Sequence, residues 1–366
     1  MIETPADLFD EWMSLPLSVE GDDPRFNVRR AAPEDYERIY DCVDAAFGKK
    51  RPRALYDWLY RENPFGRARV WIVEEIATER ILKTGAFYPW PIWRGDRPLR
   101  GSLSGDAATV PDWQRKGLSS IRRKVRRGHP WSRKIATIAG PNEGSRTVTT
   151  KAGEGSSMLG PLKGGVAVLR GAPLFERAGL PRFLSEPLGA VAGGAFSALR
   201  SLTIERGPTP QVEVIDRFTS DLDAITLATM NFPLYWCPHN ADFLNWRYLD
   251  HPVETYRGLA LVSEGRPVAY SVLRVDGDES TISEFAAAPE HAAQLMTATL
   301  AHAREANCGY TTFFAPPAWR HWGIFRRAGF IPYTTNNHLD GVYWPEKEES
   351  ERMDAWQVTP GDRDFH

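Results

Sequence analysis

The segment that decides the fold reads SLSGDAATVPDWQRKGLSSIRRKVRRG and spans residues 102–128. It runs like a β-strand up to Val110, turns at Pro111, and opens a helix between Gln114 and Ser119. The first amides of a helix have no intrahelical acceptor and lie at the positive end of its dipole. A strand, a glycine loop and a helix in this order therefore predict a site where backbone amides bind a diphosphate. Gly117 allows the phosphate to approach where a Cβ atom would clash.

The chain contains an internal repeat. The segment LYDWLYRENP (55–64) resembles FLNWRYLDHP (243–252), with three identical pairs separated by 188 residues: Trp58 and Trp246, Tyr60 and Tyr248, Pro64 and Pro252. Three further blocks match in the same order: 26–39 with 212–225, 106–113 with 284–291, and 150–155 with 326–331. Four collinear blocks indicate a duplicated domain.

Within each copy the predicted order is strand, helices, the Trp/Pro block, a hairpin, and then strand, helix, strand. This order predicts an α/β fold of mixed α+β type, with two tandem domains that each form a twisted mixed sheet flanked by helices. The predicted parts are an N-terminal extension (1–25), a first domain with the glycine loop (26–154), a Gly/Pro-rich connector with a helix (155–208), a second domain with a degenerate loop (209–345) and a C-terminal tail (346–366).

Composition narrows the class of protein. A chain of 366 residues exceeds the usual size of a single core, so two domains are expected. The net charge of -2 gives no global attraction to nucleic acid or anionic membrane. The N-terminus is acidic and no apolar stretch reaches the roughly 20 residues of a membrane span, so we expect a cytoplasmic protein without a span. The three cysteines and eight histidines lack ligand spacing, and no disulfide or metal is predicted.

The glycine loop resembles the signature of the GNAT superfamily, P-x-x-[Q/R]-x-x-G-x-[G/A], through Pro111, Gln114, Gly117 and Ser119. The resemblance extends over both repeats, about 26–153 and 212–334. It implies a tandem GNAT protein that uses acetyl-CoA or another acyl-CoA as co-substrate. It also implies that the CoA pyrophosphate binds the amides of Arg115, Lys116, Gly117, Leu118 and Ser119, that the pantetheine arm pairs with main-chain groups near Thr109 and Val110, and that Asn142 contacts the cofactor.

The sequence also departs from the family pattern. Many relatives carry a Tyr four residues before the Gly of a Gly-Phe pair, as the acid that protonates the leaving thiolate. Here the pair is Gly153-Glu154 and position 149 is Thr. The second copy keeps Gly329-Phe330, but its loop at 289–295 has no glycine. We therefore expect the second copy to shape the acceptor pocket and not to bind CoA.

Acyl transfer in this family needs no covalent enzyme intermediate, because a neutral amine attacks the thioester directly. The repeat-matched carboxylates Asp106 and Glu284 are the candidate catalytic residues, although either could be a structural hydrogen-bond acceptor. The predicted function is an acyl-CoA-dependent N-acyltransferase, in particular an N-acetyltransferase, acting on an amine of a small molecule or sugar. Because ligand sites are common at domain interfaces, we also expect the catalytic cleft to lie between the two copies.

A basic run from Arg115 to Lys134 leaves other functions open. It holds nine Lys and Arg residues and no Asp or Glu. It is either a solvated helix face that helps to bind the 3′-phosphate of CoA or a docking site for a polyanionic carrier, such as acyl carrier protein or transfer RNA. The alternatives to a small-molecule transferase are thus a carrier-dependent acyl or aminoacyl transferase and a non-catalytic protein that binds a CoA thioester.

Overall fold

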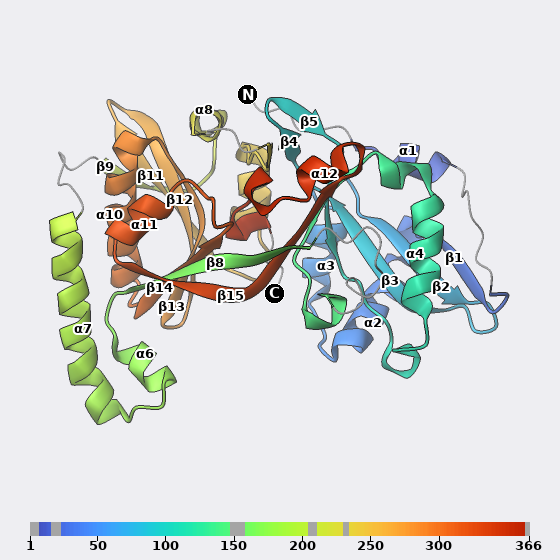
Figure 1. The fold of residues 1–366 in the computed structure, drawn as a ribbon, viewed down its shortest axis with the longest axis horizontal. Coiled ribbons are helices and arrows are strands. Elements are labelled where there is room, and N and C mark those ends of the chain that lie inside the picture. Colours follow the sequence, from blue (N-terminus) through green and yellow to red (C-terminus); the bar gives the residue numbers. More distant parts are fainter. Residues whose placement is uncertain (1–6, 16–22, 147–157, 204–210, 230–233, 363–366) are drawn as a thin grey trace.

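A computed structural model describes residues 7–15, 23–146, 158–203, 211–229 and 234–362. Twelve strands in these residues build one sheet that runs through two halves of the molecule, with helices packed against it (Figure 1). The strands follow the order β1-β2-β3-β6-β7-β15-β8-β14-β13-β12-β11-β9. Their bounds are β1 (Phe26–Arg30), β2 (Arg69–Glu75), β3 (Arg80–Pro89), β6 (Gly101–Gly105), β7 (Ala136–Ala139), β8 (Met158–Val168), β9 (Gln211–Ile215), β11 (Tyr256–Ser263), β12 (Arg266–Asp276), β13 (Glu279–Ala287), β14 (Tyr310–Ala315) and β15 (Phe330–Tyr343).

The helices occur in a similar order in both halves. In the first half they are α1 (Phe9–Ser14), α2 (Tyr36–Phe47), α3 (Arg53–Tyr60) and α4 (Leu118–Gly128). The connecting segment holds α6 (Ala172–Arg177) and α7 (Arg182–Thr203), and the second half holds α8 (Asp223–Ala228), α9 (Ala241–Leu244), α10 (Pro289–Glu305), α11 (Trp322–Arg327) and α12 (Lys347–Ser350). A small second sheet joins β4 (Ile92–Arg94), β5 (Arg97–Leu99), β10 (Tyr235–Trp236) and β16 (Trp356–Gln357). The predicted mixed α/β fold with two tandem domains is confirmed.

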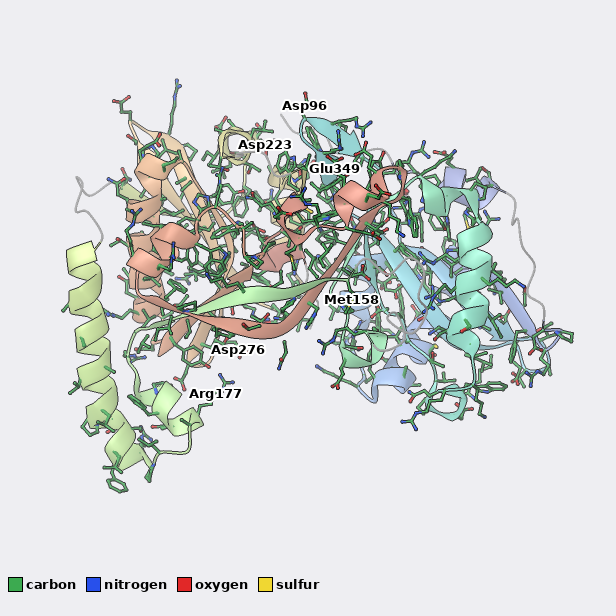
Figure 2. The ribbon with its side chains drawn as sticks, viewed as in Figure 1. Asp96, Met158, Arg177, Asp223, Asp276 and Glu349 are labelled. Carbon is green, nitrogen blue, oxygen red and sulfur yellow. The ribbon has the colours of Figure 1, made fainter. Side chains whose placement is uncertain are left out.

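The two halves exchange strands at the centre of the sheet. Strand β8 follows the first half in sequence but pairs antiparallel with β14 of the second half, from Val168 opposite Tyr310 to Lys163 opposite Ala315. The end of β15 pairs antiparallel with β7 of the first half. Figure 1 shows β8 and β15 running side by side between the halves, and Met158, where β8 begins, lies near the middle of the molecule (Figure 2). The segment predicted as a connector thus contributes a strand to the sheet as well as helix α7.

Close packing explains why β8 is rich in glycine. A Cβ atom at Gly164 would overlap the ring of Tyr333, and one at Gly165 would crowd Phe330 and Trp322. Glycine inside a strand often marks such a close approach. The aromatic side chains of β15 and α11 therefore occupy the space that side chains of β8 would otherwise fill.

A reciprocal contact between Trp58 and Trp246 relates the halves. The two rings stack with centroids 4.5 Å apart, and each indole N–H donates to the other residue's carbonyl oxygen, at 2.8 Å and 3.1 Å. A contact in which equivalent residues exchange the same bonds is the mark of a two-fold axis. The repeat detected in the sequence is therefore an approximate two-fold symmetry of the structure, and one buried apolar cluster extends across it.

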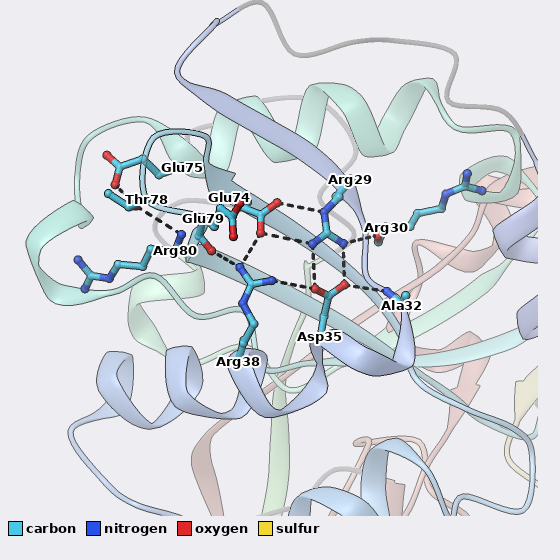
Figure 3. A network of polar contacts seen from close by, with 10 residues as sticks. All are labelled: Arg29, Arg30, Ala32, Asp35, Arg38, Glu74, Glu75, Thr78, Glu79 and Arg80. Atoms are coloured by element: carbon cyan, nitrogen blue, oxygen red, sulfur yellow. Dashed lines mark hydrogen bonds and ion pairs between the residues drawn. The ribbon is translucent and has the colours of Figure 1, made fainter.

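A network of ion pairs fixes the outer edge of the first half (Figure 3). Arg29 of β1 contacts Asp35 at 2.6 Å and Glu74 of β2 at 3.2 Å, and Arg38 of α2 contacts Glu74 at 2.6 Å. These bonds connect the first two strands with α2. They lie at the end of the sheet, whereas the glycine loop follows β6, so the network is a structural feature.

Candidate functional site

The glycine loop is open and carries unpaired amides. After β6, a 3-10 turn (Pro111–Trp113) leads to Gln114 and then to the eleven-residue helix α4, whose N-cap is Gly117. Gly117 has a φ angle of 85° and Arg115 one of 64°, and a Cβ atom at Gly117 would meet no atom within 4 Å. Within the described part of the chain, the amides of Arg115 through Ser119 have no hydrogen-bond acceptor. Unpaired amides at and just before the start of a helix are suited to binding an anion.

A gap opens in the sheet beside this loop. Strands β6 and β7 pair in parallel only from Gly101 opposite Ala136 to Ser104 opposite Ala139. The chain after β6 instead stays with β3, because the Thr84 amide donates to the Ala108 carbonyl and the Val110 amide donates to the Leu82 carbonyl, both at 3.0 Å. Beyond these pairs β6 and β7 no longer bond to each other, and the chain after β6 continues beside β3 to the glycine loop.

Thr109 and Val110, the two residues predicted to pair with the pantetheine arm, differ in whether their backbone amide is already hydrogen-bonded. The N–H of Val110 already donates to Leu82, whereas that of Thr109 has no acceptor among the described residues. The carbonyl of Thr109 accepts from the Gln114 side chain at 3.3 Å, which ties the loop to the strand. Of the two residues, Thr109 offers the free amide.

Asn142 follows β7, the strand from which β6 parts. Its side-chain oxygen accepts the Ser145 amide at 2.9 Å, and its carbonyl accepts the Arg146 amide. This is how an N-cap holds a helical turn. A contact of Asn142 with the cofactor remains a prediction. Thr149 and the Gly153-Glu154 pair lie outside the described residues.

Asp106 lies where the strands part. Its φ angle is 42°, and its carboxylate is 6% exposed. One oxygen accepts from Arg51 at 2.9 Å, and the other accepts from the hydroxyls of Tyr60 and Tyr88 at 2.9 Å and 2.8 Å. Burial and the charge of Asp106 raise the pKa values of both tyrosines well above their usual range, so both hydroxyls keep their protons.

Glu284 has matching surroundings in the second half. It accepts from Tyr248 at 2.5 Å and from His239 Nδ1 at 2.9 Å. His239 follows Arg51 by 188 residues, the separation that also relates Tyr248 to Tyr60. Each half thus buries a carboxylate with a tyrosine and a basic side chain. The comparison of the two copies did not pair Arg51 with His239, because Arg and His do not resemble each other. Their separation of 188 residues, shared with the Trp, Tyr and Pro pairs, would have identified them.

The C-terminal segment fills the cleft of the second half. Strands β13 and β14 pair only as far as Thr281 opposite Thr312, and the 3-10 turn η8 (Pro360–Asp362) contacts both beyond that point. A Cβ atom at Gly361 would overlap Tyr248 and Glu284. The segment predicted as a tail therefore lies partly in the core. Glu284, predicted to be in the catalytic cleft, is covered by this turn and is 4% exposed.

The second half also lacks the glycine loop. Helix α10 begins directly after β13, with Ala288 as its N-cap and proline at its first position. The loss of glycine that the sequence shows at 289–295 thus coincides with a continuous strand-to-helix junction. Together with the C-terminal turn that covers Glu284, this leaves the open glycine loop as a feature of the first half among the described residues.

Asp362 anchors the C-terminal turn to both halves. Its Oδ1 accepts from His239 Nε2 at 2.9 Å and from the Trp90 indole at 2.8 Å. Burial alone would lower the pKa of His239, but Glu284 and Asp362 raise it to about 10. The imidazole is therefore protonated at neutral pH and donates from both nitrogens.

We expect the stability contributed by His239 to fall with rising pH. Its folded pKa exceeds the unfolded value of 6.5, so this contribution is complete below pH 6.5 and is lost as pH rises toward 10, at roughly 1.4 kcal/mol per pH unit. Lys83 acts oppositely, because burial lowers its pKa to about 7. Urea unfolding of the wild type and of His239→Gln at pH 6.5, 7.5, 8.5 and 9.5 isolates the effect of His239, because both proteins contain Lys83 and its effect cancels in the difference. A stability difference that stays constant over this range would contradict the prediction.

The basic run is divided between the surface and the interior. Arg115, Lys116 and Lys124 are exposed, whereas the guanidinium of Arg122 lies against β3 at Gly85, where its Nε and Nη1 are buried and have no hydrogen-bond partner among the described residues. Burial lowers the pKa of Arg122 to about 9. The run is thus not a uniform solvated face, and a smaller cationic surface than the sequence suggests remains for a polyanionic carrier.

A cavity of about 10 Å³ lies between α4 and the sheet, lined by Trp12, Arg69, Phe87, Arg126 and Trp131 among others. This volume admits about one water molecule. It is too small for an acyl group.

The described residues contain no group of three or more His, Cys, Asp or Glu side chains that could hold a metal ion. No helix in the same part of the chain combines the length and apolar character needed to cross a membrane.

Comparison with solved structures shows the same fold in acyltransferases. A "Probable N-Acyltransferase" from Enterococcus faecalis has a TM-score of 0.62 at 10% identity, over 88% of this chain and 74% of its own. A GCN5-related N-acetyltransferase from Anabaena variabilis has a TM-score of 0.59 at 10% identity, over 87% and 73%. Saccharomyces cerevisiae N-myristoyltransferase with bound myristoyl-CoA has a TM-score of 0.55 at 10% identity, over 93% and 86%.

Comparison at the level of sequence finds no relative of this chain. No protein-family profile matches the chain, and no curated protein matches it. The structural likeness nevertheless spans most of the chain and confirms the fold that the glycine loop and the repeat predicted, that of the GNAT acyltransferases.

Proposed function

We propose that the first half binds an acyl-CoA and transfers its acyl group to an amine. The observation that carries this proposal is the combination of five unpaired amides at Arg115 through Ser119 with the end of β6–β7 pairing just before them. The amides suit a pyrophosphate, and the free N–H of Thr109 suits an amide carbonyl of the pantetheine arm. The exposed Arg115 and Lys116 suit further phosphate charge.

The reaction assigned to this cleft is direct aminolysis. The amine nitrogen attacks the thioester carbonyl, the C–N bond forms and the C–S bond breaks. The amine gives up a proton and the thiolate takes one, so the products are an N-acyl compound and CoA. Asp106 lies where β6 and β7 part and is the carboxylate we assign to the amine. We assign no such role to Glu284, because the C-terminal turn covers it.

Binding and turnover can be tested with the full chain. We expect acetyl-CoA, a longer acyl-CoA such as myristoyl-CoA, or both, to raise the melting temperature, since a ligand at 100 times its Kd stabilises a protein by about 2.7 kcal/mol. Calorimetry gives the Kd, and release of free thiol in the presence of an amine panel gives turnover. Absence of binding by every CoA species would overturn the proposal. Binding without thiol release from any amine would instead favour a non-catalytic CoA-thioester protein.

A further inference from the structure

The second half shows how a cleft of this fold is occupied. The C-terminal turn presents two groups to the buried cluster around Glu284. The Thr359 hydroxyl donates to the Glu284 carboxylate at 3.0 Å, and the Asp362 carboxylate accepts from His239 at 2.9 Å. The occupant thus offers a hydrogen-bond donor to the acidic residue and a carboxylate to the basic residue.

The approximate two-fold axis relates the residues that contact this occupant to a matching set in the first half. Asp106 takes the place of Glu284, Tyr60 that of Tyr248, and Arg51 that of His239. His239 uses one nitrogen for its own carboxylate and the other for the occupant. Arg51 likewise binds Asp106 through Nη1 only, and its Nε and Nη2 have no hydrogen-bond partner in the described part of the chain. By analogy with His239, we expect these donors to be available to an occupant of the first half.

The Asp106 carboxylate can accept one more hydrogen bond. A carboxylate offers about four lone-pair directions, and Tyr60, Tyr88 and Arg51 use three of them. The remaining direction lies on Oδ1, the oxygen that also binds Arg51. One acceptor site and a pair of guanidinium donors thus lie side by side.

We propose that the acceptor is a free α-amino acid, whose ammonium binds Asp106 and whose carboxylate binds the free face of Arg51. This inference rests on the proposed function and names its substrate class. A zwitterion suits the site because Arg51 and Asp106 already neutralise each other, so a neutral ligand adds no net buried charge. A planar guanidinium is also the side chain best shaped to hold a carboxylate. The amino group then lies at the mouth of the cleft that holds the thioester.

The test compares amino acids with their carboxamides. The acyl-CoA that binds most tightly is incubated with each of the twenty L-amino acids and, for those that react, with the matching carboxamide, and thiol release is followed. We expect the acid to exceed the carboxamide in kcat/KM by roughly 10- to 100-fold, the range for one charge-assisted hydrogen bond. Arg51→Met should raise the KM for the acid and remove the preference, and Arg51→Lys should restore part of it.

Arg53→Gln is the matched control. Arg53 lies two residues away on the same segment, and its partners are Glu37, Asp41 and Asp44, not Asp106. This variant should keep the preference of the wild type. The Kd for acyl-CoA, measured for all variants, shows whether the first half remains folded.

The outcomes separate the two proposals. If the wild-type protein binds no acyl-CoA, the proposed function itself is overturned. If amines are acylated but acids and carboxamides react equally, the amino-acid inference fails and the acyltransferase stands. If acyl-CoA binds and no compound in the panel reacts, each amino acid is titrated into the complex of the protein with CoA, and calorimetry measures whether it binds. Absence of binding there also overturns the inference.

Discussion

Replacing Asp106 with asparagine is expected to lower kcat by roughly 100- to 10,000-fold, the usual contribution of a positioned acid or base, while the Kd for acyl-CoA stays unchanged. Asparagine keeps the shape of the side chain but removes the charge that holds the amine and takes its proton. The proposed CoA site consists of backbone amides at Arg115 through Ser119, which the substitution does not touch. Single-turnover thiol release and calorimetry measure the two quantities separately.

Glu284→Gln is the matched control for this variant. Its carboxylate is as buried as that of Asp106 and has an equivalent basic partner and tyrosine. Both substitutions remove one buried charge, so both are expected to lower the free energy of unfolding. Only Asp106→Asn should abolish turnover. An equal loss of kcat in the two variants would show that the repeat-matched carboxylates act through stability alone.

The glycine loop and the repeat were accessible from the sequence because both rest on local patterns. Strand, turn and helix follow directly from the residues around Gly117, and the duplicated Trp/Pro block has a constant separation. The reciprocal contact of Trp58 and Trp246 then shows why these tryptophans occur in both copies. Each buries an indole against its equivalent and satisfies the other's carbonyl.

Long-range features were not accessible in the same way. Glycines such as Gly164 and Gly165 suggest a connector, since glycine weakens a strand, and only the rings of Tyr333, Trp322 and Phe330 explain them. The sequence TPGD at 359–362 looks like a turn in an exposed tail. Its burial depends on His239 and Trp90, which lie more than 120 residues earlier in the chain. Pairing over such distances has no local signature.

Replacing Gly117 with aspartate is expected to weaken acyl-CoA binding on the order of 100-fold, because the new carboxylate would lie among the amides that bind the pyrophosphate. Loss of charge-assisted hydrogen bonds worth about 3 kcal/mol corresponds to this factor. Any non-glycine residue there is also strained, since the φ angle is 85°. Gly265→Asp separates the two effects, because Gly265 has a φ angle of 75° and equally open surroundings, in the β11–β12 hairpin of the second half. Both variants should lose similar stability in urea, but only Gly117→Asp should lose affinity in calorimetry. Wild-type affinity in a folded Gly117→Asp protein would remove the diphosphate site from this loop, and with it the main support for an acyl-CoA enzyme.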